Sequence, residues 1–366
     1  MAGKSGRTVA QKQAALYVCS RPKRRAFCDD LALWRVAKSY QIVCRSMMQE
    51  SLQAFLRAHR WDEAVTRSFP ADWSMRSYAR LEKKSGSTCI LMLMPPGREF
   101  VHFQRTAKVL QACGLKAPDI YAASDNDGYM LLEDYGENNC GRMVNEGQNA
   151  EKFLEHAIDV LIHINQNVCA SSLVDYPEYG VDYFVEQLQE FGKHYVPHAT
   201  GKEWDQGEKN DFLTMMRALL SSLLQQPKTL MLRDFMLDNL MWLDDRPAAF
   251  HLGILDFELA GVSVAEYDLV SLLEVSRRNY PDTLIKKAKE KFYNAVALPS
   301  CFSVLSLQRH LRVLGVLARL SSNPLYAAKA ASMGRIETHV RKILLAEECA
   351  PLRNFFKTSF PHWAEK

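Results

Sequence analysis

Two neighbouring stretches decide the fold of this chain: Leu232-Arg-Asp-Phe-Met-Leu-Asp-Asn-Leu-Met-Trp-Leu243 and Gly253-Ile-Leu-Asp-Phe-Glu258. Residues 239–243 and 250–255 have the apolar character of short buried strands. Asp244-Asp-Arg-Pro247 lies between them and has the composition of a turn. The region therefore predicts an antiparallel hairpin.

Three polar side chains lie near the open end of this hairpin. Asp234 and Asn239 are five positions apart, and Asp256 ends the second apolar run. Residues equidistant from a turn lie opposite each other in an antiparallel pair. Asn239 and Asp256 are nearly equidistant from the link between Pro247 and Ala248. We therefore expect the hairpin to bring them together, beside Asp234.

This trio has the composition of a phosphoryl-transfer site. Transfer from Mg·ATP needs one carboxylate to orient the acceptor hydroxyl. It also needs oxygen ligands for the metal, which a carboxamide and a second carboxylate can supply. Asp234 fits the first role, and Asn239 and Asp256 fit the second.

Composition narrows the class of protein. The 366 residues suffice for two lobes, and no apolar run approaches the ~20 residues that cross a bilayer, so no membrane partner is expected. The cysteine count is nine, with no C-x-x-C pair. An odd count at irregular spacing argues against a disulfide framework or a zinc site and favours the reducing cytoplasm.

The positive charge is concentrated at the start of the chain. Residues 1–48 hold ten Lys/Arg and two Asp/Glu, whereas the remainder holds 36 basic and 40 acidic residues. The body is thus mildly acidic and offers no nucleic-acid-binding face. Residues 1–46 lack apolar periodicity and form a basic tail. Three interpretations of this tail are open: a disordered arm, a piece of an upstream domain, or an over-long start before Met47 or Met48. We expect this tail to be dispensable for folding and catalysis.

Apolar patterns divide the rest into two parts. The first part is sheet-rich, with a helix expected over 49–60, strands over 75–82 and 88–94, a helix over 99–113 and a hairpin over 120–133. After Asp134 the spacing becomes helical, with helices expected over 151–166, 183–191, 211–224, 283–297 and 306–320. This order predicts an α+β, bilobal, protein-kinase-like fold. A small antiparallel nucleotide-binding lobe (47–134) precedes a larger helical catalytic and substrate lobe (135–366), with the nucleotide between the lobes.

Five stretches in this order resemble the aminoglycoside phosphotransferase/choline kinase-like superfamily, and within it the bacterial N-acetylmuramate/N-acetylglucosamine anomeric kinases of cell-wall recycling. They are Ala71-Asp-Trp-Ser-Met-Arg-Ser-Tyr-Ala-Arg-Leu81, Leu91-Met-Leu-Met-Pro-Pro96, Leu131-Leu-Glu-Asp-Tyr-Gly136, the Asp234–Asn239 loop, and Asp256-Phe-Glu with Tyr267-Asp-Leu-Val-Ser-Leu-Leu273. The resemblance runs from about Gln49 to about Leu320. Each stretch is weak alone, but the ordered set is specific.

The resemblance implies roles for individual residues, with ATP and Mg²⁺ as cofactors. Asp234 would be the catalytic base, and Asn239 and Asp256 the Mg²⁺ ligands. Four residues would belong to the nucleotide site: Ser74 and Arg76 in a phosphate-covering turn, Met92 in the slot where kinases generally keep a lysine, and Glu133 with its backbone at the adenine edge. Arg233 and Asp268 would be structural supports, Asp268 by bracing the catalytic loop or by capping a helix over 269–275.

The chain also departs from the family pattern. Leu232 stands where a histidine is usual, Glu258 and Leu259 follow Asp-Phe in place of Gln and Asp, and Leu93 replaces an Asp. The phosphate-loop glycine is missing, and so is the lysine on strand 88–94. The recycling kinases share the missing lysine, and Arg76 or Arg80 could supply its charge.

Three functions compete at this point. The first is an ATP-dependent small-molecule kinase acting on a sugar hydroxyl, the anomeric one of an N-acetylated amino sugar. The second is an aminoglycoside or choline-type phosphotransferase, whose cationic substrates Glu258 and the acidic stretch 203–208 would suit. The third is a catalytically degenerate nucleotide-binding homologue, suggested by Leu232, Leu259 and Leu93. The choice between ATP and GTP, and the oligomeric state, stay open.

Overall fold

The computed structural model describes residues 49–69, 76–221, 226–244, 251–297, 300–321 and 331–360. The basic tail over residues 1–46 and the predicted site residue Ser74 lie outside these ranges. The described chain divides into two compact units. Unit 1 holds the residues up to Val101 together with Asp119–Asp134, and unit 2 holds His102–Pro118 and everything from Tyr135 onward. The lobe boundaries drawn from the sequence stay a proposal.

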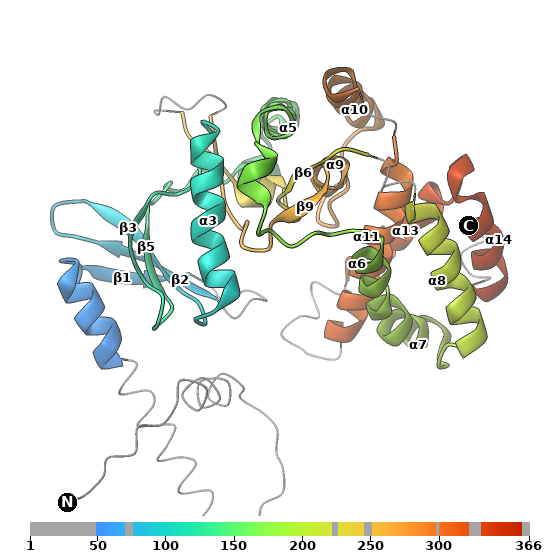
Figure 1. The fold of residues 1–366 in the computed structure, drawn as a ribbon, viewed down its shortest axis with the longest axis horizontal. Coiled ribbons are helices and arrows are strands. Elements are labelled where there is room, and N and C mark those ends of the chain that lie inside the picture. The colour runs from blue at the N-terminus through green and yellow to red at the C-terminus, as the bar shows by residue number, and fades with distance from the viewer. Residues whose placement is uncertain are drawn as a thin grey trace, which may run out of the picture. The chain divides into compact units, whose positions relative to one another are not determined.

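Unit 1 contains a five-stranded antiparallel sheet in the order β1-β2-β3-β5-β4 (Figure 1). Its strands are β1 (Val65–Ser68), β2 (Ser77–Glu82), β3 (Thr88–Leu93), β4 (Ile120–Ser124) and β5 (Tyr129–Leu132). A helix over residues 49–58 precedes them. The turn at Gly128 is tight because its φ of 76° is left-handed and a Cβ there would lie 1.8 Å from the Met94 carbonyl oxygen.

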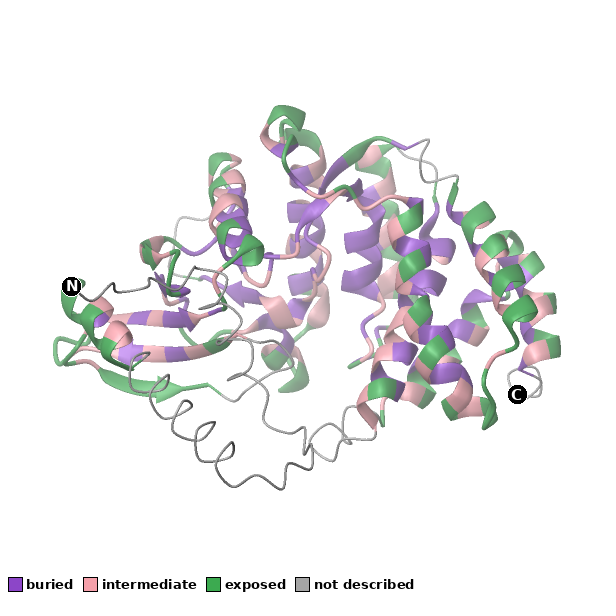
Figure 2. Cartoon of the chain, turned by 60° about the horizontal axis from the view of Figure 1, so that its bottom comes forward, coloured by how far each residue is buried: buried purple, intermediate pink, exposed green. Residues whose placement is uncertain are grey.

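The two faces of this sheet differ in burial, because successive side chains along a strand point to opposite faces. Buried and part-buried residues alternate along β2 and most of β3 (Figure 2). Cys89 and Leu91 of β3 join an apolar cluster with Leu56, Leu81 and Leu131, on which Leu52 and Phe55 of the first helix pack. Met92 is also fully buried, but alternation turns its side chain to the opposite face from Cys89 and Leu91.

Unit 2 is mostly helical. Its α-helices are α3 (Arg98–Ala112, which begins at the end of unit 1), α4 (Cys140–Asn145), α5 (Ala150–Asn167), α6 (Val181–Gln187), α7 (Val196–Thr200), α8 (Gln206–Leu220), α9 (Glu266–Leu273), α10 (Asp282–Val296), α11 (Phe302–Ser321), α13 (Met333–Ile343) and α14 (Ala350–Ser359). Side-chain caps explain several starts: Asn149 accepts from the Glu151 amide, and Asp205 accepts from the amides of Gly207 and Glu208. None of the described helices has both the length and the apolar character that crossing a bilayer demands.

Helix α11 is central to unit 2. It packs against α9, α13 and a π-helical turn at Phe191–Tyr195 (Figure 1). Gly315 allows this approach, because a Cβ at that position would lie 2.2 Å from the backbone of Glu190. Beside it lies an aromatic core in which Phe191 contacts Tyr195, Trp204, Phe212, Phe356 and Phe360.

Two short two-stranded sheets lie among these helices. Strand β6 (Lys228–Met231) pairs with β9 (Gly261–Val264), and β7 (Leu240–Trp242) pairs with β8 (Leu252–Ile254), both antiparallel. The fold class read from the sequence is therefore confirmed: an antiparallel N-terminal sheet is followed by a mostly helical part.

Several element predictions were incomplete or wrong. The helix expected over 183–191 ends at Gln187, and a separate π-helical turn follows from Phe191. The helix expected over 211–224 starts at Gln206 because Asp205 caps it there. Helix α9 covers Glu266–Leu273 rather than 269–275. Strand β1 and the β6–β9 pair were missed, since four-residue strands carry too little periodicity to be recognised.

Candidate active site

The β7–β8 hairpin brings Asn239 and Asp256 together. Leu240 pairs with Ile254, and the Leu255 amide donates to the Asn239 carbonyl at 2.9 Å, so Asp256 is one residue beyond direct opposition. Asp256 has a left-handed φ of 63°, and its Oδ2 lies 3.2 Å from Nδ2 of Asn239. The two side chains thus meet at the open end of the hairpin, where the sequence places them.

The amide of Asn239 has a defined orientation. Its Nδ2 donates to the Asp234 carbonyl oxygen at 2.8 Å, and a carbonyl oxygen can only accept. The opposite atom of the amide is therefore Oδ1, an acceptor. Nδ2 also donates to Asp256 Oδ2 at 3.2 Å, so the contact between the two side chains is this hydrogen bond. Oδ1 of Asn239 and the Asp256 carboxylate are both hard oxygen donors, the kind that Mg²⁺ prefers. Both side chains are partly exposed, so the residues fit a divalent cation chemically.

Asp234 belongs to a loop whose backbone is unusual. The preceding residue, Arg233, has a left-handed φ of 75°, which costs an L-residue about 1–2 kcal/mol. Hydrogen bonds hold Arg233 at both backbone groups: its amide donates to Asp268 at 2.8 Å, and its carbonyl accepts from Ser271 Oγ at 3.0 Å. The loop is therefore held in a strained conformation from both sides, which orients the partly exposed Asp234.

Asp268 is the main brace of this loop. Its carboxylate accepts from the Leu232 amide at 2.6 Å and from the Arg233 amide at 2.8 Å. The residue is 2% exposed, and burial raises the pKa of its carboxyl group to about 7 although the two amide bonds oppose this shift. Asp268 lies inside the first turn of α9, whose N-cap is Ala265, so it braces the loop and does not cap the helix.

Replacing Asp268 by Ala should destabilise the protein by about 2–4 kcal/mol, because the buried Leu232 amide and the part-buried Arg233 amide would each lose their acceptor, at about 1–3 kcal/mol for a buried group. Asp268→Asn should cost less, since one amide oxygen remains to accept. Urea unfolding of the two variants, compared with wild type, measures the effect. An Ala variant as stable as wild type would contradict the bracing role.

A second brace holds the other end of the loop. Asp238 forms an ion pair with Arg278 at 2.8 Å and a weaker one with Arg277 at 3.2 Å. The carbonyl of Asp238 accepts from Asn139 Nδ2 at 2.7 Å. These contacts join residues about 40 and 100 positions apart in the chain. They position Asn239 indirectly, through the short 3-10 turn Leu237–Asn239.

The residues that follow Asp256 are buried. Phe257 stacks on Phe103 with ring centroids 4.7 Å apart. Glu258 is only 4% exposed, so its carboxylate does not line an open pocket for a cationic substrate as the sequence suggested. Leu232, which occupies the position of the usual histidine, is 2% exposed and serves as a packing residue.

The predicted nucleotide residues of unit 1 occupy different environments. Arg80 forms a two-point ion pair with Asp134, at 2.7 and 3.0 Å. Its charge is thus already compensated, which weakens its candidacy as a substitute for the missing lysine. Arg76 donates to the Tyr78 hydroxyl at 3.2 Å. The amide of Glu133 donates to the Asp119 carbonyl at 2.8 Å, so this backbone donor is already engaged.

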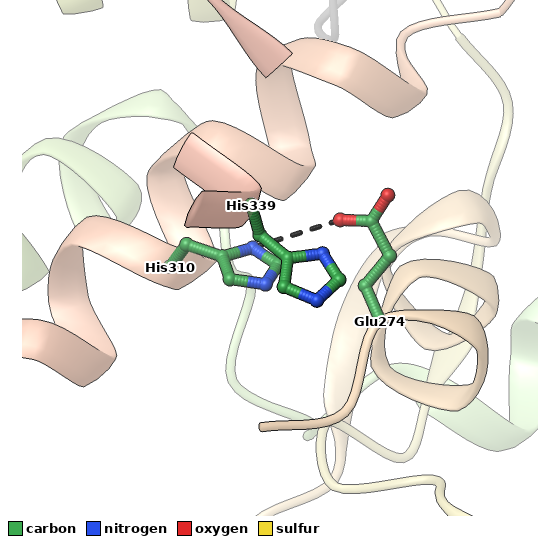
Figure 3. A group of neighbouring side chains, drawn as sticks. All are labelled: Glu274, His310 and His339. Carbon is green, nitrogen blue, oxygen red and sulfur yellow. Dashed lines mark ion pairs between the residues drawn. The ribbon is translucent and has the colours of Figure 1, made fainter. Parts of the chain in front are cut away.

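A further polar cluster lies away from the loop, where Glu274, His310 and His339 face one another (Figure 3). Three such side chains resemble a metal site. However, Nδ1 of His310 lies 2.7 Å from the Ser306 carbonyl, the Glu274 carboxylate accepts from the Ser306 hydroxyl, and His339 Nε2 pairs with Asn279. Burial lowers the pKa of His310 to about 3. We interpret the cluster as a neutral-histidine network that packs α11 against α9 and α13.

Two arginines of α11 were missed in the sequence. Arg309 is buried, and its Nε donates to Ser271 Oγ at 3.0 Å, the same hydroxyl that holds the Arg233 carbonyl. Arg312 follows three positions later, which is one turn of the helix. The one signal in the sequence was two arginines three positions apart in a helix whose neighbouring residues are largely apolar.

Comparisons with known proteins agree with this geometry. The model of the phosphotransferase enzyme family matches residues 65–295. An N-acetylmuramate/N-acetylglucosamine kinase from Pseudomonas aeruginosa is 27% identical over 299 residues, 78% of this chain and 85% of its own. One of the same name from Neisseria meningitidis serogroup B is 28% identical over 266 residues, 68% of this chain and 77% of its own.

Solved structures share the fold at low identity. A choline/ethanolamine kinase family protein from Mesorhizobium loti superposes with a TM-score of 0.57 at 10% identity, covering 85% of this chain and 99% of its own. A putative aminoglycoside phosphotransferase from Ralstonia eutropha gives 0.54 at 15% identity, with 81% and 95% covered. Since the family model spans well over half of the sequence, this chain belongs to the phosphotransferase enzyme family.

Proposed function

We propose that this phosphotransferase uses Mg·ATP to phosphorylate the anomeric hydroxyl of an N-acetylated amino sugar, N-acetylglucosamine or N-acetylmuramate. The observation that carries the proposal is the braced loop, in which Asp234 is held next to the facing pair Asn239 and Asp256. The sugar is taken from the relatives, whose names specify it. The role of each residue below is part of the proposal.

Asp234 accepts the proton of the acceptor hydroxyl as that oxygen bonds to the transferred phosphorus. The bond from this phosphorus to the bridging oxygen breaks, and the nucleoside diphosphate departs with that oxygen. Asn239 and Asp256 would hold a divalent cation, which when bound would neutralise charge on the phosphates. Asp268 and Ser271 do no chemistry; they keep the Arg233 backbone in the conformation that orients Asp234.

The two alternative functions receive less support. An aminoglycoside or choline substrate is a cation, yet Glu258 is buried, and two arginines, Arg309 and Arg312, lie on the helix beside the loop. A degenerate homologue would have no need of a strained and doubly braced loop. Retention of Asp234, Asn239 and Asp256 in one cluster favours an active enzyme.

The salt dependence of turnover separates a neutral or anionic sugar from a polycation. We expect kcat/KM for N-acetylglucosamine to change little between low and moderate salt, because hydrogen bonds hold it. A polyamine in an acidic pocket would lose affinity steeply, since the Debye length falls to ~10 Å at 0.1 M. The test measures N-acetylglucosamine, N-acetylmuramate and kanamycin in parallel. Preference for kanamycin with strong salt sensitivity would refute the sugar-kinase proposal.

A further inference from the structure

Helix α11 (Phe302–Ser321) is tied to the loop that carries Asp234. Arg309 Nε donates to Ser271 Oγ at 3.0 Å, and that hydroxyl in turn donates to the Arg233 carbonyl at 3.0 Å. Through these two bonds α11 is connected to Arg233, the residue that precedes the proposed base Asp234. Arg312, one helical turn further, lies on the same face and within electrostatic range of Asp234.

Two tyrosines lie near Arg312, which is itself half-buried. Tyr267 is 3% exposed and lies close to the guanidinium, and Tyr183 lies within electrostatic range. The Nε atom of Arg312 is buried and has no hydrogen-bond partner among the residues that the structure describes. Burying a guanidinium N–H group without an acceptor costs free energy, so the hydrogen bonding of Arg312 is incomplete.

Three arginines lie near Asp234. Arg233, Arg309 and Arg312 lie around it, and Tyr183 is within electrostatic range of both Arg233 and Arg312. The acidic groups nearby are Asp234, Asp256 beside Asn239, and the buried Asp268, whose lone pairs the backbone amides of the loop already use. On the side of Asp234 that faces α11, Arg309 and Arg312 would repel a cationic acceptor and attract an anionic one.

We propose that Arg312 forms an anion-binding subsite beside Asp234, which recognises a carboxylate on the acceptor sugar. The proposal rests on the proposed function and deepens it. N-acetylmuramate is N-acetylglucosamine with a lactyl ether that ends in a carboxylate, so the two sugars differ by this charged group. A carboxylate can accept from the guanidinium fork, including the Nε donor, in a charge-assisted pair. Arg312 is then a specificity-determining residue for the acid-bearing sugar.

The test compares kcat/KM of the full chain for both sugars after single substitutions on α11. Arg312→Met removes the charge and keeps the length, and Arg312→Lys keeps the charge without the fork. Arg319→Met is the matched control, because Arg319 lies on the same helix but is 48% exposed and pairs with Glu190. Thermal melts and far-UV circular dichroism of each variant establish that α11 is intact.

Arg312→Met should lower kcat/KM for N-acetylmuramate by about 10–100-fold, the equivalent of one lost hydrogen bond to a charged group. The value for N-acetylglucosamine should change by less than about threefold, because a neutral sugar offers no charge to pair. Arg312→Lys should retain part of the preference, and the control should change neither value.

An equal loss for both sugars would overturn the subsite, because it would mean that Arg312 only supports Tyr267 or Asp234. A wild-type enzyme that uses N-acetylglucosamine but not N-acetylmuramate would also overturn it and leave the proposed function standing. A wild-type enzyme that uses neither sugar would refute the proposed function itself. If Arg312→Met does not fold, the ratio of the two sugars for Arg312→Lys decides: an unchanged ratio rejects the subsite.

Discussion

Replacing Asp234 by Asn should lower turnover by about 10²–10⁴-fold, the contribution of a positioned general base. The carboxamide is isosteric but cannot accept the hydroxyl proton. The loop backbone should be unaffected, since its bracing bonds come from Asp268 and Ser271. Nucleotide affinity should also persist, because Asn239 and Asp256 remain. Initial rates with saturating sugar, together with nucleotide titration by calorimetry, measure both quantities.

An Asp→Asn change elsewhere controls for the loss of one negative charge. Asp211 is exposed on α8, and the Asp211→Asn variant should match wild type in every measurement. Wild-type turnover in the Asp234 variant would rule out the base. Loss of nucleotide binding together with turnover would instead indicate that Asp234 acts through the structure of the loop.

Asp256→Ala and Asn239→Ala should each lower kcat/KM by at least about 10–100-fold, since loss of even an outer-shell partner of a metal ligand has that effect. The two side chains are 3.2 Å apart and are proposed to share one cation. The double variant should therefore lose less than the product of the single losses. Each single variant should need more Mg²⁺ for half-maximal rate.

The magnesium dependence distinguishes a metal role from a structural one. Asn239 also donates to the Asp234 carbonyl, so its removal loosens the loop as well. Asn239→Asp restores an oxygen ligand but not this donor, and it should recover magnesium affinity more than turnover. Strictly multiplicative losses with an unchanged magnesium requirement would show that no ion is shared.

Much of the fold follows from local patterns. Helix α5 was predicted at 151–166 and is observed at Ala150–Asn167, because its apolar residues recur at helical spacing. Strand β3 ends one residue earlier than predicted, and strands β4 and β5 form the hairpin predicted over 120–133, which ends at Leu132. These elements are long or regular enough for periodicity to reveal them. Strand β1, which is exposed at all four residues, offered no such pattern.

The residues of the candidate site also differ in whether the sequence alone reveals them. Asp234, Asn239 and Asp256 were recognisable because one loop and one hairpin connect them within 23 residues. The partner of Arg80 was not, because Asp134 is 54 positions away and reaches it only in the folded sheet. Arg312 was likewise not assigned to the site, since its relation to Asp234 depends on the packing of α11.

The sequence by itself determined the chemistry-bearing residues, the hairpin that joins two of them, and the order of a sheet-rich part followed by helices. The physical reason is that side-chain periodicity and turn composition act over a few residues. Only the tertiary structure decided which groups hold the loop and which charges surround it. Asp268 reaches amides 36 and 35 positions away, and Arg309 reaches Ser271 across 38. Such contacts form because packing removes these groups from water and a buried amide or guanidinium must then find a partner.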